Sequence, residues 1–391
     1  MKLLHVIASA NPAGGGPIEG IIRQNNAMAA HGSRDLVTAD RPDAPFLADF
    51  PMRVHALGLR PKVLHYVPIS RYGYTPHLVP WLRKHARDYD AVVVNGLWNY
   101  AAAAAARALP DAGVPYFVYP HGMMDPWFQK TYPFKHLAKQ ASWLAFEGRL
   151  LAHADAVLFT TQEEMELAAD QFWGHRYRGV VANYGTEAPP VSSDAQLAAL
   201  HTAVPELGDR PFLLFLSRIH PKKGCDLLIK AFAACAAEHP DLQLVMAGPD
   251  SEGLTDRLKR QAEAAGIAKS VHWPGMLVGD AKWGAFYGTL AFVLPSHQEN
   301  FGIVVAEALA CSTPVLITDK VNIWREVEAG GGGIVTEDTA KSVEEGLRQL
   351  LSLSPSTLAA MRISARKTFD QNFNLSQVVP RLREILATTR R

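Results

Sequence analysis

Two cations stand five positions apart between a predicted strand and a predicted helix. Arg218 and Lys223 follow an apolar run over 212–217 and precede Gly224. At the carboxyl end of a strand, a planar guanidinium and a flexible ammonium can together hold a diphosphate. A solvated basic loop is the alternative, because charged residues mostly lie on protein surfaces.

A second polar segment follows the predicted strand 291–295. Glu299 falls in the loop, where its carboxylate can accept hydrogen bonds from sugar hydroxyls, and a helix is expected to begin near 301–302. The first amides of that helix can bind phosphate. Glu307, two turns further on, can accept from a ribose diol. Two glutamates eight apart also occur by chance, so the position of the loop matters more than the spacing.

Two further loops in the first half carry candidate residues. Gly14, Gly15 and Gly16 follow the first predicted strand and allow a ligand to approach the backbone closely. The third glycine of a dinucleotide fingerprint is replaced by Glu19, which disfavours an NAD enzyme. His121 closes another strand, where it can donate to a developing charge or hold a substrate hydroxyl. A ligand-free turn and a packed loop histidine are the respective alternatives.

The elements around these loops alternate between short apolar runs and helix-length stretches, which is typical of βαβ units and buried parallel sheets. A turn-rich segment near residue 189 separates the two halves. We therefore expect an α/β protein with a first domain over 1–188, a second over 189–372 and a terminal helix over 373–391. The expected strands are 2–8, 35–39, 53–57, 91–95, 115–120, 156–161 and 179–183, then 212–217, 242–247, 271–273, 291–295, 315–318 and 333–335.

Composition restricts the possible classes of protein. The 391 residues carry a formal net charge of +1 and are 48% hydrophobic, which argues against both a nucleic-acid binder and a disordered chain. Three scattered cysteines fit a reducing compartment, and no apolar run reaches the length of a membrane span. Asp88 and Asp90 precede a strand, at the wrong end for a ligand site. We expect no metal site and a cytoplasmic protein.

Charge is unevenly distributed along the first half. Residues 53–149 contain 12 lysines and arginines against 5 acidic residues, with aromatic residues among them. Such a surface suits the anionic inner face of the cytoplasmic membrane or a lipid-diphosphate acceptor. An ordinary solvated face over core aromatics is the alternative.

The combined motifs resemble the retaining family 4 glycosyltransferases, which have the GT-B fold of two Rossmann-like domains facing a cleft. The resemblance rests on the glycine-rich turn, His121-Gly122, Arg218 with Lys223-Gly224, and above all the segment 299–311 with its paired glutamates. It implies a donor-binding second domain, an acceptor-binding first domain, and a terminal helix that returns to the first. Asn95 departs from the family, in which histidine is frequent at that position.

The resemblance also implies roles for single residues. Arg218 and Lys223 would hold the donor diphosphate, Glu299 the transferred sugar and Glu307 the ribose. His121 would lie beside the donor sugar. Phe301, Gly302 and Ile303 would offer backbone amides to the sugar and phosphates. Further contacts to the donor or acceptor would come from Gly15, Gly16, Gly248, Met276, Leu277 and Asn300.

The implied activity is transfer of a sugar from a UDP- or GDP-sugar to a glycan or lipid-diphosphate-linked acceptor in polysaccharide biosynthesis, with retention of configuration. Cationic side chains and helix amides would stabilise the leaving diphosphate in place of a metal. No separate cofactor is expected. A nucleotide-sugar epimerase on the same fold and a catalytically silent scaffold protein remain alternatives.

Overall fold

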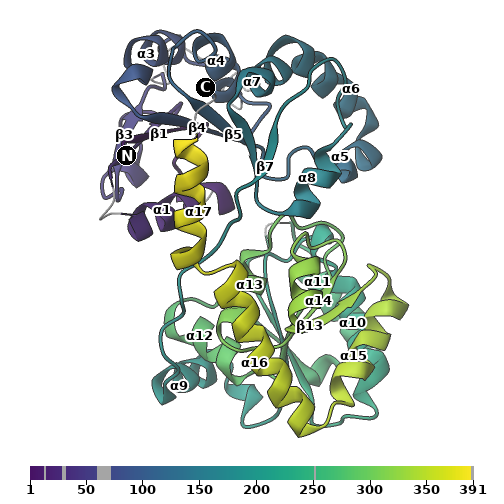
Figure 1. The fold of residues 1–391 in the computed structure, drawn as a ribbon. Helices are drawn as coiled ribbons and strands as arrows, with labels where there is room; N and C mark the ends of the chain where they lie inside the picture. Colours follow the sequence, from purple (N-terminus) through teal and green to yellow (C-terminus); the bar gives the residue numbers. More distant parts are fainter. Residues whose placement is uncertain (13–14, 29–31, 60–71, 251, 389–391) are drawn as a thin grey trace. The chain divides into compact units, whose positions relative to one another are not determined.

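A computed structural model describes the chain except for residues 13–14, 29–31, 60–71, 251 and 389–391. It divides into two compact units (Figure 1). The first comprises Met1–Tyr184 together with Val378–Arg391, and the second comprises Gly185–Gln377. The first unit ends four residues before the boundary that the turn-rich segment suggests, because Tyr184 still packs with the first unit. Gly14 and the basic residues Arg60, Lys62 and Arg71 lie outside the described residues.

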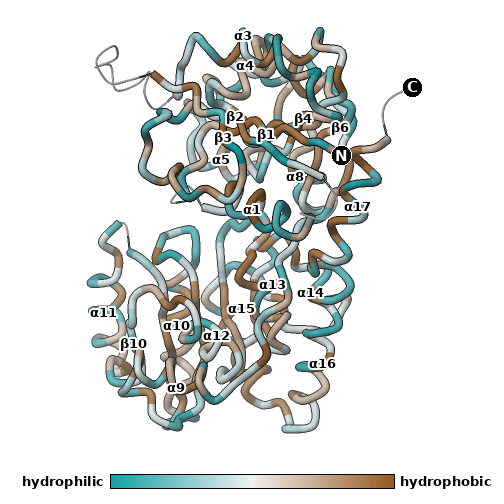
Figure 2. The backbone as a smooth tube through the Cα atoms, turned by 90° about the vertical axis from the view of Figure 1, so that its left-hand side faces the viewer, coloured by the Kyte–Doolittle hydropathy of each residue, from teal (hydrophilic) through white to brown (hydrophobic). Residues whose placement is uncertain are grey.

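The first unit is built on a parallel seven-stranded sheet in the order β3-β2-β1-β4-β5-β6-β7. Its central strands are apolar and β-branched, which suits a sheet covered on both faces, and they are coloured brown in Figure 2. The strands are β1 (Leu3–Ile7), β2 (Arg34–Thr38), β3 (Arg53–Ala56), β4 (Ala91–Asn95), β5 (Tyr116–Tyr119), β6 (Ala156–Phe159) and β7 (Gly179–Val181).

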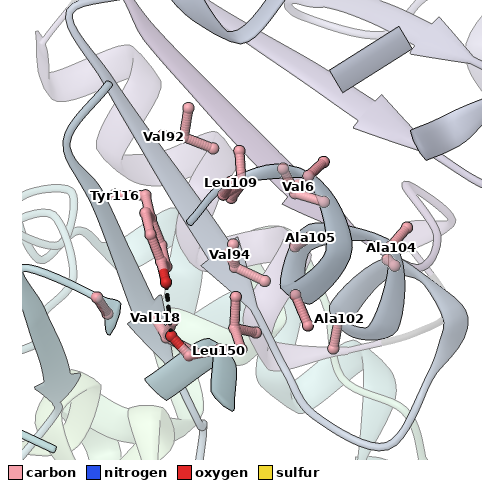
Figure 3. Packing of buried hydrophobic residues seen from close by; sticks show 14 of the residues in the cluster. Val6, Val92, Val94, Ala102, Ala104, Ala105, Leu109, Tyr116, Val118 and Leu150 are labelled. Carbon is pink, nitrogen blue, oxygen red and sulfur yellow. Dashed lines mark hydrogen bonds between the residues drawn. The ribbon is translucent and has the colours of Figure 1, made fainter. Parts of the chain in front are cut away.

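Helices cover both faces of this sheet (Figure 1). They are α1 (Gly16–Met28), α3 (Leu78–His85), α4 (Tyr100–Ala108), α5 (Pro126–Thr131), α6 (Pro133–Ser142), α7 (Gly148–His153) and α8 (Gln162–Ala168). In α4 the small alanines allow close packing: Ala102 and Ala105 lie against Val6 and Val94 of the sheet (Figure 3). The hydroxyl of Tyr116 in the same core donates to the Leu150 carbonyl at 2.8 Å.

The second unit holds a parallel six-stranded sheet in the order β10-β9-β8-β11-β12-β13. Its strands are β8 (Phe212–Leu216), β9 (Gln243–Ala247), β10 (Val271–Gly275), β11 (Ala291–Leu294), β12 (Val315–Thr318) and β13 (Gly333–Thr336). Its helices are α9 (Asp194–Ala203), α10 (Cys225–Ala236), α11 (Thr255–Ala264), α12 (Gly279–Gly288), α13 (Ile303–Ala310), α14 (Trp324–Gly330), α15 (Ala340–Leu351) and α16 (Pro355–Asn372). Every strand expected from the sequence is confirmed to within two residues.

The terminal helix α17 (Leu375–Ala387) contributes to the core of the first unit (Figure 1, yellow). Leu382 and Leu386 are buried in one cluster with Phe117 and Leu158 of the sheet. The Asn374 side chain accepts from the Ser376 amide at 3.0 Å and so caps the helix start.

Strand order reverses once in each sheet, and the reversal positions the loops of interest. In the first sheet β1 lies between β2 and β4, and in the second β8 lies between β9 and β11. Loops that leave two such neighbouring strands diverge to opposite faces and leave a crevice at the carboxyl ends of the strands, where open α/β sheets bind ligands. The segments 217–224 and 296–302 leave β8 and β11, so they flank the reversal of the second sheet.

Candidate functional site

The loop after β8 packs against the segments that follow β9 and β11. The Ile219 amide donates to the Pro249 carbonyl at 2.9 Å, and Ile219 itself is buried. Gly224 has a φ of +63°, and a Cβ there would lie 1.8 Å from the Pro295 carbonyl oxygen. Glycine is therefore required at this contact. The loop leaves Arg218 exposed, whereas Lys223 is buried.

Lys223 and Glu299 form an ion pair between the two loops at the strand reversal. Only 8% of the Lys223 side chain and 21% of the Glu299 side chain are exposed. The Lys222 carbonyl also accepts from the His297 amide at 2.8 Å, which joins the loops through their backbones. The structure thus brings together two residues, 76 positions apart in sequence, that we selected separately.

The backbone of Glu299 is fixed by the loop after β12. Its amide donates to the Lys320 carbonyl at 2.9 Å, and its carbonyl accepts from the Asn322 amide at 3.0 Å. The Asn322 side chain lies 3.5 Å from the Asn300 amide oxygen. These contacts use the backbone of Glu299 and the side chain of its neighbour Asn300. The oxygens of the Glu299 carboxylate therefore remain able to bind a cation or a hydroxyl.

The start of α13 lies directly beside this pair. Gly302 has a φ of +71°, and a Cβ there would come within 3.2 Å of Glu299 Cγ and of Val321. Phe301 is buried, with its ring edge against Phe373 at 5.6 Å between centroids. Because the first N–H groups of a helix have no partner within it, the amides of Ile303 and Val304 can bind an anion, whereas the Val305 amide donates to the Gly302 carbonyl at 2.8 Å.

Glu307 lies deeper than the sequence suggests. It is 2% exposed, and Lys282 Nζ of α12 lies 2.8 Å from its carboxylate. The Lys282 ammonium also lies 4.7 Å from the centroid of the Trp283 ring. Sequence reasoning missed Lys282, because a single lysine within a helix carries no motif that links it to Glu307.

Two loops expected to border a nucleotide base meet at the same end of the sheet. The Gly248 amide donates to the Gly275 carbonyl at 2.7 Å. A Cβ on Gly248 would lie 1.8 Å from the Ser217 carbonyl oxygen, immediately before Arg218. Of the two following residues, Met276 is 65% exposed and Leu277 is buried. The sequence-predicted residues of the second unit therefore gather at the carboxyl ends of β8 to β11.

In the first unit, the described glycines of the glycine-rich turn are Gly15 and Gly16. Gly15 has a φ of +83°, and a Cβ on Gly15 or Gly16 would meet nothing within 4 Å. The Tyr184 hydroxyl donates to the Gly16 carbonyl at 3.0 Å. A Cβ on Gly20 would lie 1.2 Å from that hydroxyl, so glycine is required here to leave space for the Tyr184 side chain. The turn can approach a ligand through its backbone.

His121 belongs to a neutral hydrogen-bond network at the ends of β4 and β5. Its Nε2 lies 3.1 Å from Asn95 Oδ1, and its ring stacks on Tyr119. Burial lowers the pKa of His121 to about 4. Because Asn95 Nδ2 donates to the Val93 carbonyl at 3.1 Å, its Oδ1 accepts from His121 Nε2–H. The remaining nitrogen, Nδ1, is then an acceptor, which suits a hydroxyl better than a developing negative charge.

Two more residues of this network escaped sequence reasoning. Glu164 accepts from the Gly122 amide at 2.6 Å and from the Thr160 amide at 2.7 Å, which fixes the turn after His121. His5 is buried with its Nδ1 3.4 Å from Asn95 Nδ2, and burial lowers its pKa well below the usual value. Asn95, the departure from the family pattern, is therefore the residue that orients His121.

Other features of the described residues add no second candidate site. They contain no group of three or more His, Cys, Asp or Glu side chains placed to hold a metal. None of their helices is both long and apolar enough to cross a bilayer. A cavity of about 490 Å³ beside β13 is lined by acidic residues, among them Glu337 and Glu345, and contains none of the predicted site residues.

Two Rossmann-like units with polar loops at their strand reversals define an α/β protein of the GT-B class. Residues 15–185 match the family model "Glycosyl transferase 4-like domain", and residues 199–368 match "Glycosyl transferases group 1". Together the two models cover most of the chain. The chain belongs to this family of glycosyltransferases.

Curated relatives agree with this family. D-inositol 3-phosphate glycosyltransferase of Geodermatophilus obscurus is 29% identical over 221 residues, 53% of this chain and 49% of that protein. The enzyme of the same name from Rhodococcus opacus is 29% identical over 232 residues, 56% of this chain and 50% of that protein. The chain thus spans about half the length of these relatives.

Solved structures are similar over the whole chain. Anabaena HepE in complex with UDP-glucose superposes with a TM-score of 0.74 at 20% identity and covers 99% of both chains. Sucrose-phosphate synthase from Thermosynechococcus elongatus gives a TM-score of 0.77 at 19% identity and covers 98% of both. At this identity the likeness establishes the fold, which is GT-B.

Proposed function

We propose that the chain transfers a sugar from a nucleoside-diphosphate sugar to a glycan or lipid-linked acceptor in polysaccharide biosynthesis. The observation that carries the proposal is the Lys223–Glu299 pair at the strand reversal, with Arg218 exposed on the same loop and the amides of α13 beside it. This arrangement offers cations to a diphosphate and a carboxylate to sugar hydroxyls at one place.

The charges match what the leaving group requires. Breaking the anomeric bond adds negative charge to the diphosphate, and donors already fixed where charge develops lower the barrier most. Lys223 is held by Glu299, whose backbone is itself held by Lys320 and Asn322. The site is therefore prepared before the donor arrives. Two cations and helix amides offset the charge, so the proposal requires no metal ion.

The proposed transfer proceeds with retention. The acceptor hydroxyl oxygen forms a bond to the anomeric carbon on the face from which the diphosphate departs, and the bond between that carbon and the diphosphate oxygen breaks. The departing oxygen takes the hydroxyl proton, so no protein base is required. His121 would accept a hydrogen bond from a sugar hydroxyl through Nδ1, and Glu307 would bind the ribose.

The choice of donor and acceptor draws on the relatives. HepE was solved with UDP-glucose, and the curated relatives are named for D-inositol 3-phosphate. We infer a UDP- or GDP-sugar as donor, and a lipid-diphosphate-linked glycan as an acceptor that fits the basic segment 53–149. Such an acceptor would bring the chain to the cytoplasmic face of a membrane.

The test measures donor binding and turnover separately. Thermal-shift titration with UDP-, GDP- and ADP-sugars should raise the unfolding temperature for one base, because a ligand bound to the native state stabilises it. Lys223→Ala and Arg218→Ala should each lower turnover about a hundredfold to a thousandfold. The matched control is Lys341→Ala, because the Lys341 side chain is 87% exposed. Rates equal to wild type in both site variants would refute the proposal.

Product analysis separates the remaining alternatives. NMR of the product should show the anomeric configuration of the donor, and a chelator should leave the rate unchanged. An epimerised nucleotide sugar formed without acceptor would identify an epimerase instead. Donor binding with neither transfer nor hydrolysis would identify a scaffold protein.

A further inference from the structure

Helix α6 and the π-helical turn Trp143–Glu147 that continues it expose large apolar side chains. The face turned into the first unit carries Gln140, Trp143 and Glu147, all buried, and two of these are polar. The opposite face exposes 86% of Phe134 and 66% of Leu137. A helix on the surface of a protein ordinarily places its apolar side chains inward. This helix instead presents them to its surroundings.

A neighbouring loop enlarges the exposed apolar surface. Trp173, 68% exposed, is held by Gln140, which donates to its carbonyl and accepts from its amide at 3.1 and 3.2 Å. A Cβ on Gly174 would lie 2.5 Å from Leu144, which is itself 41% exposed. The α6 patch, defined as Phe134, Leu137, Leu144 and Trp173, is therefore a fixed surface.

The inner face of the helix shows why the patch cannot turn inward. Phe172 stacks on Trp143 at 5.0 Å and on His136 at 4.8 Å between ring centroids. Glu147 accepts from the Ser142 hydroxyl at 2.7 Å. Rotating the helix to bury Phe134 would expose this aromatic cluster and break these hydrogen bonds. The exposure of the patch is built into the unit.

The elements that carry or adjoin the patch also expose basic residues. Lys130, Lys135 and Arg149 are exposed on α5, α6 and α7. The single acidic residue in 126–153 is Glu147, which is buried. In the loop 169–178, Asp170 is outnumbered by two arginines. This part of the first unit thus combines exposed apolar side chains with an excess of basic residues.

We propose that the α6 patch docks the first unit onto an anionic lipid bilayer. Phenylalanine, leucine and tryptophan enter the boundary between headgroups and acyl chains, while lysine and arginine bind anionic headgroups. A second copy of the chain is a poorer occupant, because a two-fold contact through the patch would bring together two segments that each carry an excess of basic residues. The inference locates the membrane contact of the proposed function but does not depend on the donor site.

Vesicle co-sedimentation of the full chain, without donor or acceptor, tests this proposal. We expect binding to vesicles of equal parts phosphatidylcholine and phosphatidylglycerol, and much weaker binding to phosphatidylcholine alone. The double variant Phe134→Ser, Leu137→Ser should lower the partition coefficient at least about tenfold. The matched control is Ile363→Ser on α16, where the side chain is 73% exposed in the second unit.

Charge reversal gives an independent readout. Lys135→Glu should weaken binding to the anionic vesicles by about fivefold or more at low salt, and added salt should reduce the difference. Lys341→Glu is the control. Equal binding by wild type and the double variant would overturn the proposal, as would a concentration-dependent dimer that the double variant abolishes. UDP-sugar binding measured on the same samples shows whether the donor site is intact, so failure of docking and failure of the proposed function are distinguishable.

Discussion

The strand reversals of the two sheets have the same geometry but opposite chemistry. In the second unit the loops meet through charge, with Lys223 on Glu299 and Arg218 exposed nearby. In the first unit a neutral network joins His5 of β1 and Asn95, the last residue of β4, to His121, which follows the neighbouring strand β5. A charged crevice suits a diphosphate, whereas a neutral one suits hydroxyl groups. One sheet topology thus supports two kinds of recognition, and the side chains decide which.

Two lysine–glutamate pairs of the second unit, Lys223–Glu299 and Lys282–Glu307, differ in burial. Lys223–Glu299 lies at the crevice, whereas Glu307 of Lys282–Glu307 is 2% exposed. A pair at the strand reversal can exchange partners with a ligand, whereas removal of the cation beside a buried carboxylate is strongly destabilising. The first pair should therefore matter mainly for turnover and the second also for stability.

The largest stability effect should come from the buried pair. Lys282→Met removes a cation that lies 2.8 Å from the buried Glu307 carboxylate, which should lower the free energy of unfolding by about 3–5 kcal/mol. Urea unfolding measures the loss. Lys230→Met is the matched control, because Lys230 lies 3.9 Å from Asp226 with 57% of its side chain exposed, and such pairs contribute at most about 1 kcal/mol. Equal losses in the two variants would contradict the distinction between the pairs.

An intermediate effect should appear in the pH dependence of the neutral network. Burial lowers the pKa of His121 to about 4 in the folded state, and the unfolded value is about 6.5. Below pH 6.5 the unfolded chain therefore binds a proton that the folded chain does not, so stability is complete above this pH and falls as the pH drops toward 4. Because His121 is half-buried, we expect about 2 kcal/mol over this range.

His121→Gln isolates this contribution, because glutamine keeps a polar group but does not titrate. The variant should lose less stability than wild type between pH 6.5 and pH 4, whatever its stability at neutral pH. His201→Gln, in α9 of the second unit, is the control. Identical pH profiles for wild type and His121→Gln would show that the histidine titrates as freely in the folded chain as in the unfolded one.

The residues at the two strand reversals also show which parts of the structure could be predicted from the sequence. Strand positions follow from apolar runs, and parallel order follows from their alternation with helices, so Lys223 and Glu299 could be placed at strand ends. The partners of these residues could not be predicted. Lys282 lies 25 positions before Glu307 and meets it only because α12 and α13 pack in one unit. Asn95 orients His121 only because β4 pairs with β5.

The exposed apolar face of α6 could not be predicted from the sequence either. The sequence shows aromatic and basic residues over 126–149 but does not show which of them lie inside. Trp143 and Phe134 are both large and apolar, yet one is fully buried and the other is 86% exposed. The difference depends on Phe172, which stacks on Trp143 from a loop 29 positions further along the chain. Periodicity alone cannot select the inward face when both faces carry aromatic residues.

The smallest effect should come from the hydrogen bond between Asn95 and His121. Asn95→Ala removes the acceptor of His121 Nε2–H and should lower the free energy of unfolding by about 1 kcal/mol. The ring is then no longer restricted to one tautomer, so the ¹⁵N shifts of His121 should move toward the values of a tautomer mixture.

Asn99→Ala is the control. It removes the cap of α4 in the same unit and should lower the free energy of unfolding by a similar amount. That control should leave the His121 shifts unchanged, because Asn99 bonds to Ala102 and Leu97 rather than to the ring. Shifts that stay constant in both variants would mean that Asn95 stabilises the unit without orienting the histidine.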